Sequence, residues 1–186
     1  EGQAQGAPVP LEIGQGTRAI AAQKNFSTGA LIQTGNQLDV AIEGSGFLRI
    51  NQPDGSYAYT RSGMLKIDAD GRLTNAEGKA LDPPVEIPSE ATNVVIEPDG
   101  TVKIGLNNEP IPVEVGRLEL TQFINPAGLK SLGHNLYAET DASGEPLSGA
   151  PNEDGLGSIQ QGMLESSNVE VIEEMISLIA AQRAYE

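Results

Sequence analysis

The sequence predicts a mainly β protein: one antiparallel, hairpin-rich β domain with an extended N-terminal arm and a C-terminal α-helix. Three observations support this fold class. Short alternating apolar runs recur from residue 38 onward, and several of them are joined by Asp-Gly turns. Glycine and proline are frequent, at 22 and 12 residues, whereas aromatic residues make up only 4% of the chain. The last twenty residues show helical rather than strand periodicity.

These patterns divide the 186 residues into three segments. Residues 1–24 have the composition of an extended arm, which becomes ordered when a partner holds it. Residues 25–166 are the predicted β domain. Residues 167–186 are predicted to start a longer helix, because the pattern reaches the last residue without a glycine cap or a proline.

The β domain is predicted from paired short strands. An alternating run around Val40 is followed by a Gly-Ser-Gly bend and a second run that starts at Phe47. Gly44, Gly46 and Phe47 are therefore expected to shape the fold and not to bind a ligand. Further on, the Asp-Gly turns at residues 54–55, 70–71 and 99–100 each predict a hairpin, since glycine accepts the positive φ that such turns require.

Two longer segments complete the β domain. Residues 113–123 alternate between apolar and polar side chains and predict one long strand. Residues 141–157 are rich in glycine, proline and serine and predict a surface loop.

The C-terminal segment predicts an amphipathic helix with two apolar rows. Ser167 and Glu170 form a capping box at its start. A helix that lies on its own domain needs one apolar stripe, so two rows indicate contact with neighbours on two sides. Burial of both rows inside one compact fold is the alternative, because periodicity cannot say whose atoms cover a helix. The expected assembly interface is Val169, Val171, Ile172, Met175, Ile176, Leu178, Ile179, Arg183 and Tyr185.

Composition disfavours several classes of function. The formal net charge is −15, which argues against nucleic acid as a partner and against direct lipid binding at an anionic membrane. The chain has no cysteine and one histidine, His134, expected in a turn before Asn135. A multi-histidine zinc site is therefore excluded, and no cofactor or metal is expected.

Two motifs match known binding patterns only in part. Residues 14–19 fit the dinucleotide pattern G-x-G-x-x-A but lack the βαβ unit that gives those glycines their role. Residues 68–71 resemble the opening of a calcium loop but lack its later ligands, so a hairpin turn is preferred. Abundant acids leave a hydrolase open as a third hypothesis, behind a binding module and a structural polymer subunit.

Several separated motifs nevertheless resemble one family. The AIEGSGF run at residues 41–47, AYTRSG at 58–63 and DADGRL at 68–73 are similar to those of flagellar rod and hook proteins. GQGTR at 14–18, NPAGL at 125–129, GHNLY at 133–137 and QRAYE at 182–186 favour the distal rod type. The chain is expected to be truncated at both termini relative to that family.

The resemblance implies a structural role and no enzymatic activity. Such proteins are exported through the flagellar type III apparatus and stack into a rigid hollow rod in the basal body, which crosses the periplasm and transmits torque to the hook. The implied partners are further copies of the chain, the proximal rod proteins, the hook protein and the surrounding P-ring and L-ring. A stand-alone adhesin or carbohydrate-binding module is the alternative.

Overall fold

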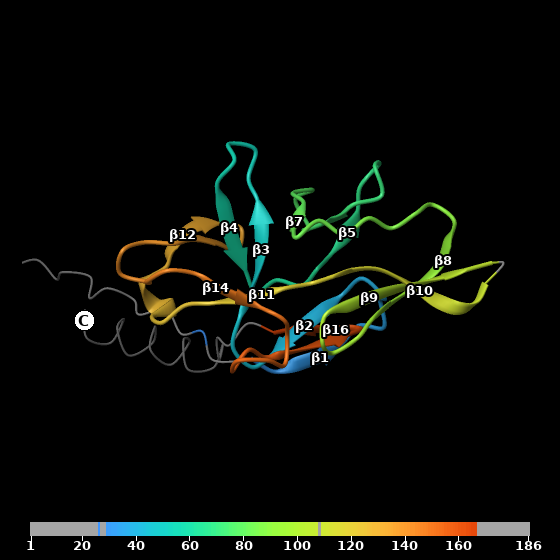
Figure 1. Ribbon diagram of the computed structural model, residues 1–186. Helices are drawn as coiled ribbons and strands as arrows, with labels where there is room; N and C mark the ends of the chain where they lie inside the picture. Colours follow the sequence, from blue (N-terminus) through green and yellow to red (C-terminus); the bar gives the residue numbers. More distant parts are fainter. Residues whose placement is uncertain (1–25, 27–28, 108, 167–186) are drawn as a thin grey trace, which may run out of the picture.

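The computed structural model describes residue 26, residues 29–107 and residues 109–166 (Figure 1). In these residues the fold is mainly β, as predicted, with one short 3₁₀ turn, η1 (Pro126–Gly128). The strands of the first half are β1 (Leu31–Gln33), β2 (Val40–Glu43), β3 (Phe47–Asn51), β4 (Tyr57–Thr60), β5 (Lys66–Ile67), β6 (Leu73–Thr74), β7 (Leu81–Asp82) and β8 (Ala91–Ile96). Those of the second half are β9 (Thr101–Leu106), β10 (Glu109–Arg117), β11 (Leu120–Gln122), β12 (Lys130–Gly133), β13 (Leu136–Ala138), β14 (Leu147–Gly149), β15 (Ser158–Gln161) and β16 (Met163–Glu165).

The strands form small sheets, and the pairings between them are antiparallel throughout the described part of the chain. The largest sheet has seven strands, in the order β12-β13-β4-β3-β11-β14 with β7 on β3. A three-stranded sheet has the order β10-β9-β8, and three two-stranded ribbons are β1-β16, β15-β2 and β5-β6. Three of these sheets, namely β1-β16, β15-β2 and the seven-stranded sheet, pair strands that lie far apart in the sequence, so most of the fold depends on distant pairings.

One turn geometry closes each predicted hairpin. In the β3–β4 turn the N–H of Gly55 donates to the carbonyl of Gln52, and the N–H of Gln52 donates to the carbonyl of Ser56. Gly55 has a φ of 83°, as this turn requires. The same pattern recurs in the turns that end at Gly71, Gly78 and Gly100. The three hairpins predicted from Asp-Gly are therefore confirmed, and a further turn of this kind lies at residues 75–79.

Acid is expected to weaken these turns. The pKa values of Asp54, Asp68 and Asp99 lie below the ordinary 3.8, chiefly because each carboxylate accepts a hydrogen bond. The main donor to Asp54 is the side chain of Ser56. For Asp68 it is the backbone N–H of Arg72, and for Asp99 the backbone N–H of Thr101. Since folding lowers these pKa values, the stabilisation is present above pH 3.8 and is lost as the pH falls through the folded values.

We therefore expect the free energy of unfolding, measured by urea denaturation, to fall between about pH 5 and pH 2. Replacing the three turn aspartates with asparagine should flatten this dependence. The matched control is Asp141→Asn, which changes an exposed aspartate outside these turns. An unchanged pH profile in the triple variant would contradict the assignment.

Two predictions about the later segments were wrong in part. Residues 113–123 do not form one strand: β10 ends at Arg117 and pairs with β9, whereas β11 pairs with β3 and β14 in another sheet. Leu118 is buried between them, and its N–H donates to the carbonyl of Gly100. The apolar positions shift from odd (Val113, Val115) to even (Leu118, Leu120) across Gly116 and Arg117, and this change of parity marks the change of sheet. The predicted loop at 141–157 also contains a strand, β14, which covers the edge of β11.

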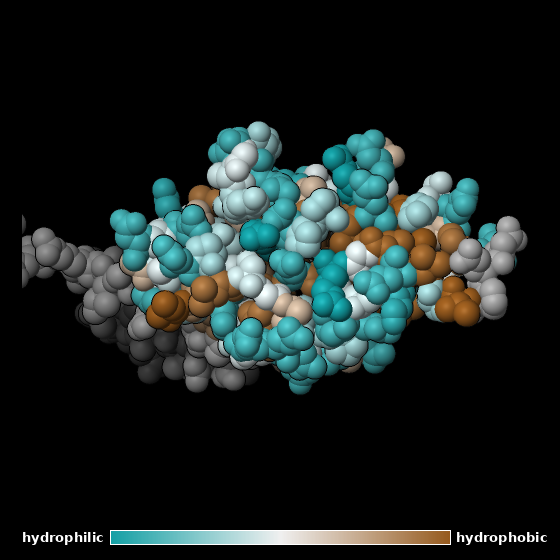
Figure 2. Space-filling view, viewed as in Figure 1, coloured by the Kyte–Doolittle hydropathy of each residue, from teal (hydrophilic) through white to brown (hydrophobic). Residues whose placement is uncertain are grey.

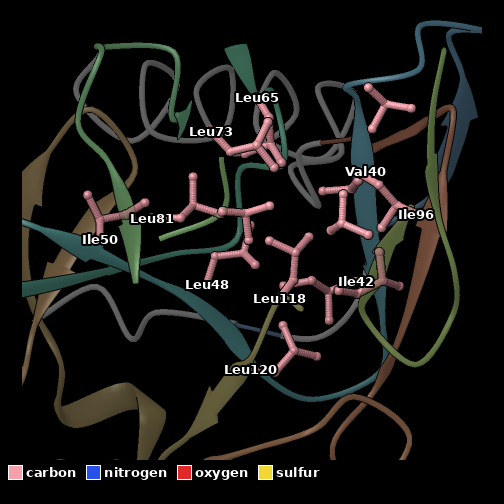
Figure 3. Packing of buried hydrophobic residues seen from close by; sticks show 14 of the residues in the cluster. Val40, Ile42, Leu48, Ile50, Leu65, Leu73, Leu81, Ile96, Leu118 and Leu120 are labelled. Atoms are coloured by element: carbon pink, nitrogen blue, oxygen red, sulfur yellow. The ribbon is translucent and has the colours of Figure 1, made fainter. Parts of the chain in front are cut away.

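The main core lies where the sheets meet (Figure 3). Val40 and Ile42 of β2 and Leu48 and Ile50 of β3 belong to one cluster, to which the later half adds Leu118 and Leu120. Each of these aliphatic side chains is almost fully buried. Their burial ties the small sheets together, because no single ribbon could bury an apolar face alone.

Several sequence predictions concern residues outside the described part of the chain. These are the arm at residues 1–24, the G-x-G-x-x-A motif and the C-terminal helix with its nine expected interface residues. Among the described residues, no helix has the length and apolar character needed to cross a membrane.

Candidate functional site where the two chain ends meet

The first and last described strands lie side by side. β1 pairs with β16, with Leu31 opposite Glu165 and Gln33 opposite Met163. The N–H of Ser166 donates to the carbonyl of Ala30 at 2.8 Å, which extends this pairing to the last described residue. We call residues 29–34 and 162–166 the neck. The first and last strands of the described β domain therefore lie at one place (Figure 1).

Arg61 holds the neck to the body of the domain. Its Nε lies 2.9 Å from Oε2 of Glu165, and its Nη2 lies 3.2 Å from Oε1. Its Nη1 donates to the carbonyls of Gly44 and Gly46, each at 3.1 Å, and Nη2 donates to the carbonyl of Ile42. Both charged side chains are only 13% exposed. One largely buried guanidinium thus joins β16 to the bend between β2 and β3.

The bend that meets Arg61 depends on its glycines. Gly44 has a φ of 114° and Gly46 a φ of 136°, a region that side chains other than glycine rarely adopt. A Cβ on Gly44 would also lie 2.9 Å from the Cα of Gly157. The bend turns the carbonyl groups of Gly44 and Gly46 toward the same guanidinium, whereas that of Ser45, between them, accepts from the N–H of Gly157.

Phe47, the third residue expected to shape the fold, belongs to an aromatic cluster. It is 2% exposed and packs edge-to-face against Phe26 at 5.3 Å and Phe123 at 6.0 Å between ring centroids. Phe26 also contacts Tyr137, and Tyr59 contacts Phe123. This cluster therefore packs Phe26, the first described residue, against the seven-stranded sheet.

Tyr59 carries the polar contact of this cluster. Its hydroxyl donates to Oε2 of Glu139 at 3.2 Å. Burial, followed by the charge of Glu139, raises the pKa of Tyr59 well above its usual value. The hydroxyl therefore stays protonated and continues to donate at any physiological pH.

Sequence reasoning missed Arg61, Glu165 and Phe26 as site residues. Arg61 and Glu165 are 104 positions apart, and a single sequence holds no signal for so distant a pair. The AYTRSG motif did contain Arg61, so that residue could have been singled out by asking which carboxylate an arginine inside a strand-to-loop motif would meet.

The other sequence candidates are placed in turns. His134 and Asn135 have φ values of 52° and 59° and close the β12–β13 hairpin, as expected. The Asp68 carboxylate accepts hydrogen bonds from the backbone N–H of Asp70 and of Arg72, and residues 68–71 form the preferred hairpin turn. Within the described part of the chain, no group of three or more His, Cys, Asp or Glu side chains could hold a metal ion.

Comparison with known proteins agrees with this architecture. Residues 41–104 match the model of the flagellar hook protein FlgE/F/G D1 domain, and residues 160–186 match that of the flagellar basal body rod FlgEFG protein C-terminal region. The first match covers the bend and Arg61, and the second begins at β15 and includes Glu165. The ion pair of the neck therefore joins the two matched regions.

Several relatives cover almost the whole chain. The flagellar basal-body rod protein FlgG of Borreliella burgdorferi is 42% identical over 96% of this chain and 68% of its own length. That of Agrobacterium fabrum is 41% identical over 96% of the chain and 68% of its length. That of Bacillus subtilis is 34% identical over 94% and 67%.

The small antiparallel sheets, with the first and last described strands paired at the neck, are thus those of a flagellar rod or hook subunit. Within this class, the chain belongs to the FlgG family of flagellar basal-body rod proteins. It is a structural subunit of the rod in the flagellar basal body and not an enzyme.

Proposed function

We propose that residues 25–166 form the outer β layer of a distal rod subunit, and that residues 1–24 and 167–186 serve assembly. The rod would be a rigid, hollow helical shaft that crosses the periplasm and transmits motor torque to the hook. Family membership supports the rod itself, since the relatives are named as basal-body rod proteins. The division of labour between the segments is our proposal.

The observation that carries this proposal is the neck. Force that enters through either terminal segment reaches the β domain across the β1–β16 pairing and the bidentate Arg61–Glu165 contact. The planar guanidinium donates hydrogen bonds to one carboxylate and three carbonyl groups. These bonds resist both sliding and rotation of β16 relative to the domain. Such a junction suits a shaft that must turn without the outer layer twisting against the inner one.

The C-terminal helix would pack against neighbouring subunits. Each buried Ile, Leu or Met side chain would contribute roughly 1.5–3 kcal/mol to the contact. We expect Ile176→Asp to abolish rod assembly, because it places a charge in an apolar row. The matched control is Ser177→Asp, one position along and on the remaining face, which should assemble normally. The measurement is the yield of rods in purified basal bodies; equal yields from both variants would rule out this interface.

Other partners follow from the same proposal. The arm would bridge to a neighbouring subunit, and the rod would meet the proximal rod proteins, the hook protein, the P-ring and the L-ring. Subunits would reach the rod by flagellar type III export. With a net charge of −15, neither nucleic acid nor direct lipid binding is expected. Nothing in the comparisons favours the alternative of a stand-alone binding module.

Sedimentation would test the proposal. The chain spans 68% of the length of the Borreliella burgdorferi protein. It should be compared with a longer version that carries the terminal segments of such a relative. Long rods from the extended version alone would support assembly through the terminal segments. If the extended version stayed monomeric at high concentration, the proposed role of those segments would be wrong.

A further inference from the structure

The two edges of the three-stranded sheet differ in shape. At the β10 edge, Ile111 is 74% exposed and Val113 is 37% exposed. Beside β8, at the opposite edge, lies a groove of about 720 Å³. Its apolar lining includes Leu38, Ile67, Ile87, Pro88, Ala91 and Val94. Figure 2 shows apolar side chains gathered at this end of the molecule, over β8 to β10.

A bulge in β10 presents Ile111 outward. Glu109 pairs with Leu106 and Val113 pairs with Ile104, so three residues of β10 lie opposite one residue of β9. The extra residues are Pro110, Ile111 and Pro112. Proline fixes its own φ and restricts the residue before it to extended conformations. Ile111 is therefore held in place by its neighbours and loses little conformational entropy on binding.

We call the outward-facing bulge residues Ile111 and Pro112 the ridge. The strand register places this ridge level with the groove. Gly105 is the residue of β9 opposite the bulge, and its partner on β8 is Asn93, which lines the groove. The ridge and the groove thus lie at the same height on opposite edges of one sheet. If one copy is translated perpendicular to the strands, within the plane of the sheet, its ridge meets the groove of the next copy.

At each of these two edges, some backbone N–H groups are missing or already hydrogen-bonded, which hinders the addition of a further strand. Pro110 and Pro112 remove two N–H donors from β10. On β8, side-chain oxygens of Gln37 and Gln161 accept hydrogen bonds from the N–H of Val94 and of Ile96. The Nε2 of Gln161 also donates to the carbonyl of Val94 at 2.8 Å. At the level of the bulge and the groove, these features favour a partner that binds through side chains.

We propose that the ridge formed by Ile111 and Pro112 of one subunit docks in the β8 groove of a second copy. This inference rests on the proposed rod function and adds a specific contact to it. Ridge and groove are different surfaces, so the contact is heterologous and continues from copy to copy, as a helical polymer requires. Each copy carries a net charge of −15, so the apolar contact also has to offset repulsion between subunits.

Cysteine cross-linking tests this contact in assembled rods, because the chain has no cysteine of its own. Asn107 lies at the tip of the β9–β10 hairpin, one residue after Leu106, which pairs with Ala91 of β8. Ser89 lines the groove two residues before Ala91. Asn107→Cys and Ser89→Cys would be introduced separately into the full-length rod protein. Rods of each variant and of their mixture would then be treated with a short bismaleimide.

We expect cross-linked dimers from the mixture and none from either variant alone. Adding Ile111→Ser should reduce cross-linking at least about tenfold, the effect of removing one buried aliphatic side chain from a contact. The matched control is Ile124→Ser, since Ile124 is 83% exposed and belongs to neither surface.

Three results would overturn the inference. Dimers from Asn107→Cys alone would mean a symmetric contact and not ridge into groove. Equal cross-linking with Ile111→Ser and Ile124→Ser would mean that Ile111 does not anchor the contact. Rods that form without a 107–89 cross-link would remove the docking site while leaving the rod function intact, whereas failure to form rods would remove both.

Discussion

Replacing Arg61 with methionine is expected to lower the free energy of unfolding by about 3–5 kcal/mol, the usual cost of removing one partner from a buried ion pair. The variant leaves the Glu165 carboxylate nearly buried without its guanidinium. It also removes the donor from the carbonyls of Ile42, Gly44 and Gly46. Urea denaturation followed by circular dichroism measures the loss.

Two further variants separate charge from geometry. Arg61→Lys keeps the charge but cannot form the planar fork, so it should recover less than half of the loss. Arg72→Met is the matched surface control: Arg72 pairs with Asp68 and Asp70 while 43% exposed, and its loss should cost no more than about 1 kcal/mol. If Arg61→Met cost as little as Arg72→Met, the neck would not depend on the guanidinium.

The local part of the fold could be predicted from the sequence. The β3–β4, β5–β6 and β8–β9 hairpins were each predicted from an Asp-Gly turn, because the positive φ of the glycine is a local requirement. The type of each turn could not be predicted from the sequence. A type I turn followed by glycine and a two-residue type I′ turn both accept Asp-Gly, and only the hydrogen bonds distinguish them.

The site was beyond such reasoning because it is made by pairing between distant segments. The sequence indicated that Gly44 and Gly46 shape a bend, but not that their carbonyls meet Arg61. It gave no indication that β1 pairs with β16, since a three-residue strand carries too little periodicity to specify a partner. The split between β10 and β11 did leave a local sign, since the apolar positions change parity between Val115 and Leu118, but that sign does not say which strands become the new partners.

Replacing Gly63 with alanine is expected to lower the free energy of unfolding by about 3 kcal/mol, at the upper end of the usual cost of overpacking. A Cβ on Gly63 would lie 1.8 Å from the carbonyl oxygen of Val40, which is backbone and cannot rotate away. The N–H of Val40 donates to the carbonyl of Gly63 at 2.9 Å, so separating the two segments also breaks this bond. Arg61 lies two residues before Gly63, so the same displacement would pull the guanidinium away from Glu165.

The matched control is Gly55→Ala, which tests backbone strain without a clash. Gly55 has a φ of 83°, and a Cβ there would meet nothing within 4 Å. Alanine at this position should cost about 1–2 kcal/mol, the price of left-handed backbone alone. If the close approach of residue 63 positions Arg61, then Gly63→Ala combined with Arg61→Met should cost clearly less than the sum of the two single variants. Full additivity, measured in the same urea denaturation series, would show that Gly63 stabilises β2 independently of the neck.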